Sequence, residues 1–237
     1  TYLYNMSHAL IEQLLKYQPL FHPVVPFEPW REKLVMLDLS VTNTELTDTI
    51  LEDVHLFSEW VTGKIQQGNA RYAIGGYDEH RTVYSKSRVF DAINDREPRR
   101  LHLGVDIWGQ EGTAVLAPLD GIVHSFAFNN QVGDYGATII LSHRLERQSF
   151  FSLYGHLNLQ SLKELREGKQ IKKGEIFAAL GSPPENGNWP PHLHFQLIET
   201  MDGWKGDYPG VCPFSEKENW LANSPDPELI LQLKQYL

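Results

Sequence analysis

Hydrophobic residues near the start of the chain recur at the spacing of one helix face. Ser7, a residue type that caps helices, precedes four apolar positions in helical register, and Pro19 follows them. The four positions are Leu10, Ile11, Leu14 and Leu15. The pattern predicts an amphipathic helix that begins near Ser7 and ends before Pro19. The apolar run within residues 33–40 fits a buried strand or a short helix equally well.

A second helical pattern lies between Thr42 and Gln67. Its apolar positions are Ile50, Val54, Phe57, Val61 and Ile65. Gly68 is expected to end this helix. The sequence leaves two possible first turns for this helix, because capping boxes begin at both Thr42 and Thr49.

Beyond residue 71 the pattern changes to short apolar segments with β-branched residues, separated by turns that contain glycine. The expected strands span residues 112–117, 122–128, 137–143, 150–157 and 175–180. Asp120-Gly121 is a hairpin signal between the first two of these strands. Strands at this spacing favour an antiparallel, mainly β architecture within an α+β fold class, with the N-terminal helices as an added layer. Segments 112–117 and 174–178 look alike, which hints at a duplicated unit.

The segment Pro190-Pro191-His192-Leu193-His194-Phe195 carries the first candidate chemistry. In a strand, His192 and His194 project from one face while Leu193 and Phe195 project from the other. Two imidazoles on one face can share a metal ion. The alternative is a strand with two polar residues turned to solvent.

An upstream pair raises the odds of a metal site. His102 and Asp106 flank Leu103-Gly104-Val105, and their even spacing puts both side chains on one face of an extended segment. Two histidines and one aspartate make a three-ligand zinc set. Such a set leaves a fourth tetrahedral position for water, as a catalytic site requires.

Composition and net charge limit the classes of partner that the protein is expected to bind. The chain has 237 residues, 41% of them hydrophobic, which suits either one core or a core with a smaller accessory domain. A net charge of −9 argues against nucleic acid and anionic membranes, which require a basic surface. The sequence contains no run of about 18 apolar residues, so no membrane span is expected. The single cysteine, Cys212, excludes an internal disulfide and is expected to be a small buried side chain.

The cellular compartment is left undetermined. Residues 1–5 lack the basic, apolar and small-residue order of a signal peptide, which favours the cytoplasm for this chain alone. Removal of a targeting segment would place the protein in the periplasm or outside the cell. Without an initiator methionine, the chain is also compatible with a place in a larger multidomain protein or complex.

Several separated motifs occur in an order that resembles the lysostaphin/LytM-type zinc metalloendopeptidases. They lie within residues 100–198 and are His102-x-Gly-x-Asp106, Gly112-Thr113, Ala117-Pro-x-Asp-Gly121, Tyr135-Gly136, Tyr154-Gly-His156-Leu157, Gly174, Gly181 and His192-Leu-His194-Phe195. Agreement of several motifs in order is far more specific than any one of them.

The resemblance implies a role for each matched residue. His102, Asp106 and His194 would hold one Zn²⁺ per chain, and His156 and His192 would be the catalytic histidines. It further implies a barrel-sandwich hybrid with a duplicated motif. The domain would cover residues 71–237, with residues 1–70 as a helical accessory region.

One loop departs from the family. Typical members have a Ser/Thr/Gly-rich turn before the His-x-His strand, whereas residues 181–191 here contain four prolines and Trp189. With residues 76–81, 206–211 and 225–229, this loop is more similar to metallopeptidase-like modules fused to a kinase-like domain and a class III aminotransferase. We expect residues 182–191 to form one rim of the cleft and Trp189 and Arg100 to contact substrate. Residues 75–81 are expected to be ordinary surface rather than part of a site.

The leading function is therefore that of a zinc metalloendopeptidase that cleaves peptide bonds in peptidoglycan peptides or cross-bridges. A non-catalytic regulatory or binding module of the same fold is the first alternative. The presence of all five site residues favours the enzyme. A metal-dependent hydrolase of a small amide metabolite is the second alternative, motivated by the similarity to fused modules and by the missing signal peptide.

Overall fold

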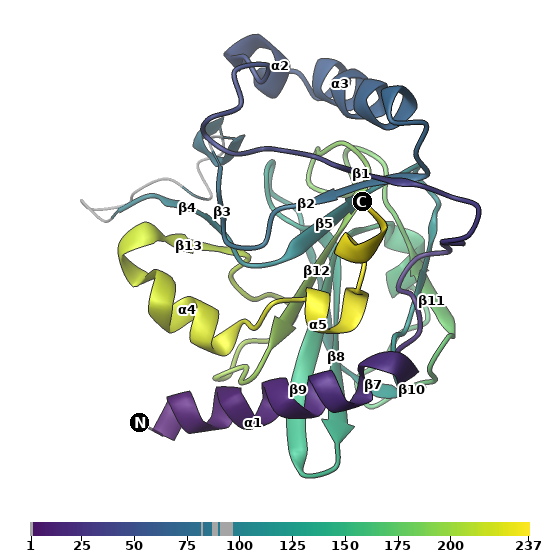
Figure 1. Cartoon of the computed structure of the whole chain (residues 1–237), viewed down its shortest axis with the longest axis vertical. Helices are drawn as coiled ribbons and strands as arrows, with labels where there is room; N and C mark the ends of the chain where they lie inside the picture. Colours follow the sequence, from purple (N-terminus) through teal and green to yellow (C-terminus); the bar gives the residue numbers. More distant parts are fainter. Residues whose placement is uncertain (1, 82, 87–89, 91–96) are drawn as a thin grey trace.

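The computed structural model describes residues 2–81, 83–86, 90 and 97–237 (Figure 1). Its helices are α1 (Tyr2–Tyr17), α2 (Asp48–Glu52), α3 (Val54–Gln67), α4 (Lys217–Asn223) and α5 (Glu228–Leu231). Its strands are β1 (Leu34–Met36), β2 (Tyr72–Gly75), β3 (Glu79–His80), β4 (Arg99–His102), β5 (Val105–Trp108), β6 (Ala114–Leu116), β7 (Gly121–Asn129), β8 (Gly136–Leu145), β9 (Gln148–Leu157), β10 (Gln170–Ile171), β11 (Ile176–Ala179), β12 (His192–Ile198) and β13 (Val211–Pro213).

A single large sheet carries most of these strands, in the order β1-β2-β5-β12-β9-β8-β7-β10. All its neighbours pair antiparallel except β1 and β2, which run parallel. A second sheet has the order β13-β4-β3, and β6 pairs with β11 in a third. The long β7, β8 and β9 form a meander. Buried positions alternate with more exposed ones in β7, whereas β8 and β9 are buried on both faces over most of their length.

The mainly β fold with a few helices confirms the expected fold class. The expected barrel is not found, because in the described part of the chain the large sheet stays open between its edge strands β1 and β10. The two similar sequence segments supply β6 and β11, which pair with each other. Asp120-Gly121 was expected to close a hairpin, but β7 pairs with β8 and β10 rather than with β6, so that expectation is wrong.

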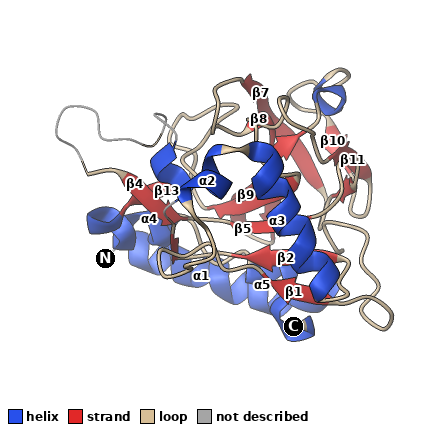
Figure 2. Cartoon of the chain, turned by 90° about the horizontal axis from the view of Figure 1, so that it is seen from above, coloured by secondary structure: helices blue, strands red, loops and turns tan. Residues whose placement is uncertain are grey.

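Residues 2–70 pack on the sheet from two ends of the molecule. In Figure 1, α2 and α3 lie at the top and α1 lies at the bottom. Helix α1 contacts β9, and its Leu10 and Leu14 are buried in the main core. Figure 2 shows α3 on the near side of β1 and β2, which it contacts. The region is not wholly helical, because β1 joins the large sheet; a domain boundary at residue 70 stays a prediction.

The helix positions correct two expectations. Helix α1 already includes Ser7, so this residue is not its cap, although the helix does end before Pro19. The second helical pattern is split into α2 and α3, whose caps are Thr47 and Asp53 rather than either predicted threonine. The Asp53 carboxylate accepts hydrogen bonds from two backbone N–H groups of the first turn of α3. No helix among the residues described has the length and apolar character of a membrane span.

Candidate metal centre

Strand β12 orients the two histidines of the His-x-His motif as the strand alternation predicts. Leu193 and Phe195 are fully buried in the main core on one face. His192 and His194 occupy the other face, yet both are buried, at 5% and 3% exposure. The alternative, two polar side chains turned to solvent, is therefore wrong.

The side chains of His102 and Asp106 converge as expected, but they come from two different sheets rather than from one extended segment. His102 ends β4 of the three-stranded sheet, whereas Asp106 lies in β5 of the large sheet. The chain passes between the sheets at Gly104, where an added Cβ would lie only 2.6 Å from the His194 ring. Glycine at this position thus lets the strand pass close enough to bring the three side chains together.

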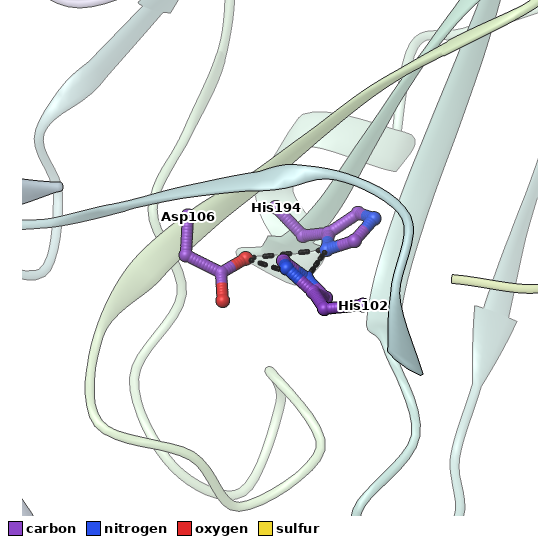
Figure 3. A group of neighbouring side chains, drawn as sticks. All are labelled: His102, Asp106 and His194. Atoms are coloured by element: carbon purple, nitrogen blue, oxygen red, sulfur yellow. Dashed lines mark hydrogen bonds and ion pairs between the residues drawn. The ribbon is translucent and has the colours of Figure 1, made fainter. Parts of the chain in front are cut away.

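One ligand atom from each of these residues faces the other two (Figure 3). His102 Nε2 lies 2.9 Å from His194 Nδ1 and 3.4 Å from Asp106 Oδ1. His194 Nδ1 lies 3.2 Å from Asp106 Oδ1. A tetrahedral zinc ion with bonds of about 2.0–2.1 Å holds its ligand atoms about 3.3 Å apart, so the spacing suits zinc.

Hydrogen bonds on the far side of each ring fix its tautomer. His102 Nδ1 donates to the Gly76 carbonyl at 2.8 Å, which leaves Nε2 without a proton. His194 Nε2 donates to Gln196 Oε1 at 3.0 Å, and the Gln196 amide nitrogen donates onward to the Pro209 carbonyl and to Ser224 Oγ. His194 Nδ1 is therefore the free acceptor of its ring.

Three acceptor atoms thus converge with no proton to share, an arrangement that a cation stabilises. Burial lowers the pKa of His102 to about 3, helped by the nearby Arg81 guanidinium, so its ring is neutral. Burial by itself would raise the pKa of Asp106, but His102 and Arg81 hold it well below its usual value. A neutral-imidazole and carboxylate donor set in this protonation state is what zinc requires.

His156 and His192 lie beside this cluster. Their ring centroids lie 4.1 Å apart, with the planes tilted by 33°. His156 Nδ1 donates to the Asn186 carbonyl, and His192 Nδ1 donates to the Pro190 carbonyl. Each ring therefore keeps Nε2 as its acceptor. His192 Nε2 lies 3.9 Å from Asp106 Oδ1. Burial lowers the pKa of both rings, so both are neutral bases near pH 7.

The N-terminal layer supports His192 through Trp108. The indole of Trp108 stacks on the His192 ring, with centroids 5.6 Å apart and planes at 22°. Trp108 belongs to the same buried cluster as Phe57 and Val61 of α3. Leu39 and Phe57 also line the pocket that contains the histidines.

Aromatic side chains make up much of the wall of that pocket. Tyr84, Trp108, Tyr135, Trp189, Trp204 and Tyr208 all line it. Trp189 Nε1 donates to the Asp134 carbonyl, and the ring meets Tyr84 edge-on. The fully buried Asn186 holds the loop, because its side-chain amide bonds Gly181 and both backbone polar groups of Trp189. The expected rim residue thus lies at the pocket, and its contact with substrate stays a prediction.

The structure places two arginines, Arg100 and Arg81, differently from what the sequence suggests. Arg99, rather than Arg100, lines the pocket, and the Arg100 guanidinium donates to the carbonyls of Phe90 and Arg99. Substrate binding by Arg100 stays a prediction without support from this geometry. Residues 75–81 are not ordinary surface. Arg81 is 1% exposed and binds Asp106, and the sequence offered no signal for it beyond the narrower family similarity.

Two carboxyl groups add acidity to the pocket wall. Asp134 and Asp207 are half-buried lining residues. Burial, together with the nearby Asp207, raises the pKa of Asp134 to about 6. Burial raises the pKa of Asp207 as well. This side of the pocket can therefore both donate and accept hydrogen bonds near neutral pH.

The remaining strand histidines lie outside the metal cluster. His143 is a satisfied core residue of β8, because its Nδ1 donates to the Asp120 carbonyl and its Nε2 accepts from Ser152 Oγ at 2.6 Å. Half-buried His124 contacts Ser125 Oγ. Neither residue lines the pocket.

Burial of His143 predicts acid destabilisation. Burial lowers its pKa from 6.5 to about 4, so the unfolded chain takes up this proton first. Stability is therefore lost as pH falls from about 6.5 to about 4, and the His143 contribution between about pH 7 and pH 5 is about 2 kcal/mol. Urea unfolding of metal-free protein at both pH values should show this difference shrink in His143→Gln. An equal pH dependence in parent and variant would contradict the assignment.

Comparison with known proteins finds a family similarity over the residues of this site. Residues 100–206 match the model of Peptidase family M23, and the match includes all five site residues. The chain is 37% identical over 131 residues to an uncharacterized metalloprotease of Haemophilus influenzae, a match that covers 55% of this chain and 25% of that protein.

Two further relatives have different named roles. The DD-carboxypeptidase/endopeptidase Mpg of Neisseria meningitidis is 31% identical over 97 residues, covering 41% of this chain and 20% of that protein. The murein hydrolase activator NlpD of Escherichia coli is 32% identical over 95 residues, covering 40% of this chain and 22% of that protein. The matches span a quarter or less of these relatives. The narrower similarity to fused modules is not addressed by them and stays a prediction.

Proposed function

From the match of residues 100–206 to the model of Peptidase family M23, we propose that the chain is a zinc-dependent endopeptidase acting on peptidoglycan peptides or cross-bridges. The convergence of three unprotonated acceptor atoms, from His102, Asp106 and His194, is the observation that carries the proposal. The relative that is named as an endopeptidase supports the substrate class.

His102 Nε2, Asp106 Oδ1 and His194 Nδ1 would hold the zinc ion. Bound zinc lowers the pKa of water toward about 7 and polarises a carbonyl group. His156 and His192 would supply the proton transfers. Each is neutral, each presents Nε2, and each is held in place by a hydrogen bond from Nδ1 to a backbone carbonyl. A neutral imidazole accepts a proton from the attacking water and can return it to the leaving amine.

The loop with Trp189 would form one wall for the substrate. Replacing Trp189 with alanine is expected to raise KM roughly 2- to 10-fold with little change in kcat, because the ring contributes contact rather than chemistry. Trp30→Ala is the matched control, since Trp30 is 83% exposed and does not line the pocket. An unchanged KM in a folded Trp189→Ala protein would remove Trp189 from the substrate site.

A digest of defined peptidoglycan fragments tests the function itself. Zinc-loaded protein is incubated with muropeptides and the products are read by mass spectrometry. We expect new fragments that have gained one water at a peptide bond, their loss after chelation, and their return when zinc is restored. A zinc-loaded, folded protein that leaves every fragment intact would contradict the endopeptidase proposal.

The regulatory alternative is supported by the similarity to a murein hydrolase activator. A module of this kind would yield no products alone but would increase product formation by a separate murein hydrolase in the same digest. Cleavage of a small amide metabolite, with peptides left intact, would instead favour the second alternative, a metal-dependent hydrolase of such a metabolite.

A further inference from the structure

A buried arginine that lines the same pocket lies against the candidate metal centre. The Arg81 side chain is 2% exposed. Its Nη1 donates to Asp106 Oδ2 at 2.6 Å and to the Tyr84 hydroxyl at 3.1 Å. Its Nε donates to Glu79 Oε2, also at 2.6 Å. Such short, charge-assisted bonds fix both carboxylates in one orientation.

The backbone is shaped to admit this guanidinium. Gly76 has φ +100°, and a Cβ there would lie 1.8 Å from Arg81 Nη2. The same Gly76 carbonyl accepts the hydrogen bond from His102. One turn therefore positions a candidate ligand and makes room for the arginine that holds another.

The network continues into the N-terminal region. Glu79 Oε1 accepts a hydrogen bond from the backbone N–H of Leu39 at 3.2 Å. Ser40 forms a β-bridge with Arg81 itself. Segment 39–40 thus anchors both partners of the ion pair that reaches Asp106.

We propose that Arg81 is a positioning residue that presents Asp106 to the metal through Oδ1 alone. The inference rests on the proposed zinc site. Because Oδ2 is engaged by Arg81, the carboxylate cannot turn to offer both oxygens, and a fourth position stays open for water. The alternative is a structural role, in which Arg81 only neutralises two buried carboxylates, Glu79 and Asp106.

The positioning role and the structural role are separated by measuring metal binding in three variants and in the parent protein. Zinc affinity is measured by competition with a chelator of known affinity, and the coordination number is read from the visible absorption of bound Co²⁺, which weakens when four-coordinate cobalt becomes five-coordinate. Arg81→Lys keeps the charge but lacks the fork that reaches both carboxylates. Glu79→Gln/Arg81→Gln removes one charge of each sign. Arg144→Lys, an exposed arginine of β8, is the control.

We expect Arg81→Lys and the double variant to bind zinc about 10- to 100-fold more weakly than the parent, with weakened cobalt absorption. Arg144→Lys should match the parent. Parental affinity and cobalt spectrum in either folded Arg81 variant would overturn the positioning role. Should Arg81→Lys fail to fold, the double variant decides, since it removes both charges of the Glu79–Arg81 pair and leaves only Asp106, which a bound metal ion would neutralise. A parent protein that binds neither metal would instead refute the zinc site itself.

Discussion

Replacing His194 with alanine is expected to reduce zinc from one per chain to near zero and to abolish activity. About 10–16 kcal/mol of zinc binding shared among three protein ligands puts a few kcal/mol on each, so the loss should be about 10³-fold or more. This exceeds the effect expected for Arg81, which touches only a ligand. Zinc content after dialysis, measured by elemental analysis, reports the result.

Asp106→Ala should lose zinc to the same extent, but it also deprives the buried Arg81 of one of its two carboxylate partners. His194→Ala is therefore the cleaner variant, and circular dichroism must show that both fold. His124→Ala is the matched control, since His124 is a strand histidine that does not line the pocket. Retention of zinc by His194→Ala together with its loss from His192→Ala would mean that the roles on β12 are exchanged.

His156→Ala and His192→Ala are expected to separate catalysis from metal binding. Each should retain close to one zinc per chain, because the three converging acceptor atoms remain. Turnover should fall about 10²- to 10⁴-fold, the usual contribution of one positioned acid or base. The effects should not add in the double variant, since the two adjacent rings would serve one proton-transfer path.

Zinc content and kcat measured on the same preparation test this separation. His143→Gln provides a control with a buried histidine outside the pocket. Full turnover in both single variants, on a substrate that the parent cleaves, would rule out the assigned catalytic roles. The proton acceptor would then have to be another group at the pocket.

Strand alternation was sufficient to predict how His192 and His194 are oriented, because β12 is regular and its opposite face is pure core. The same reasoning failed at His102 and Asp106. They do converge, but from different sheets, since the chain turns at Gly104 between β4 and β5. Alternation describes one strand and says nothing about how two sheets meet.

The groups that hold the site histidines and Asp106 in place could not be predicted from sequence patterns, for a related reason. The carbonyls that fix the histidine tautomers come from Gly76, Asn186 and Pro190, all in loops. Backbone groups carry no sequence signal of their own. Arg81 looked like surface because a charged residue is buried only when its partners are in place, and Asp106 lies 25 positions away. The open sheet likewise depends on long-range pairing of β1 with β2.

Anomalous diffraction at the zinc absorption edge, from crystals of protein purified without added metal and then supplied with one equivalent of zinc, tests the central claim most directly. The account predicts one anomalous peak about 2.0–2.2 Å from each of His102 Nε2, Asp106 Oδ1 and His194 Nδ1. His192 and His156 should lie near this peak without coordinating the zinc ion. A peak elsewhere, or no peak at this cluster under zinc-replete conditions, would contradict the account.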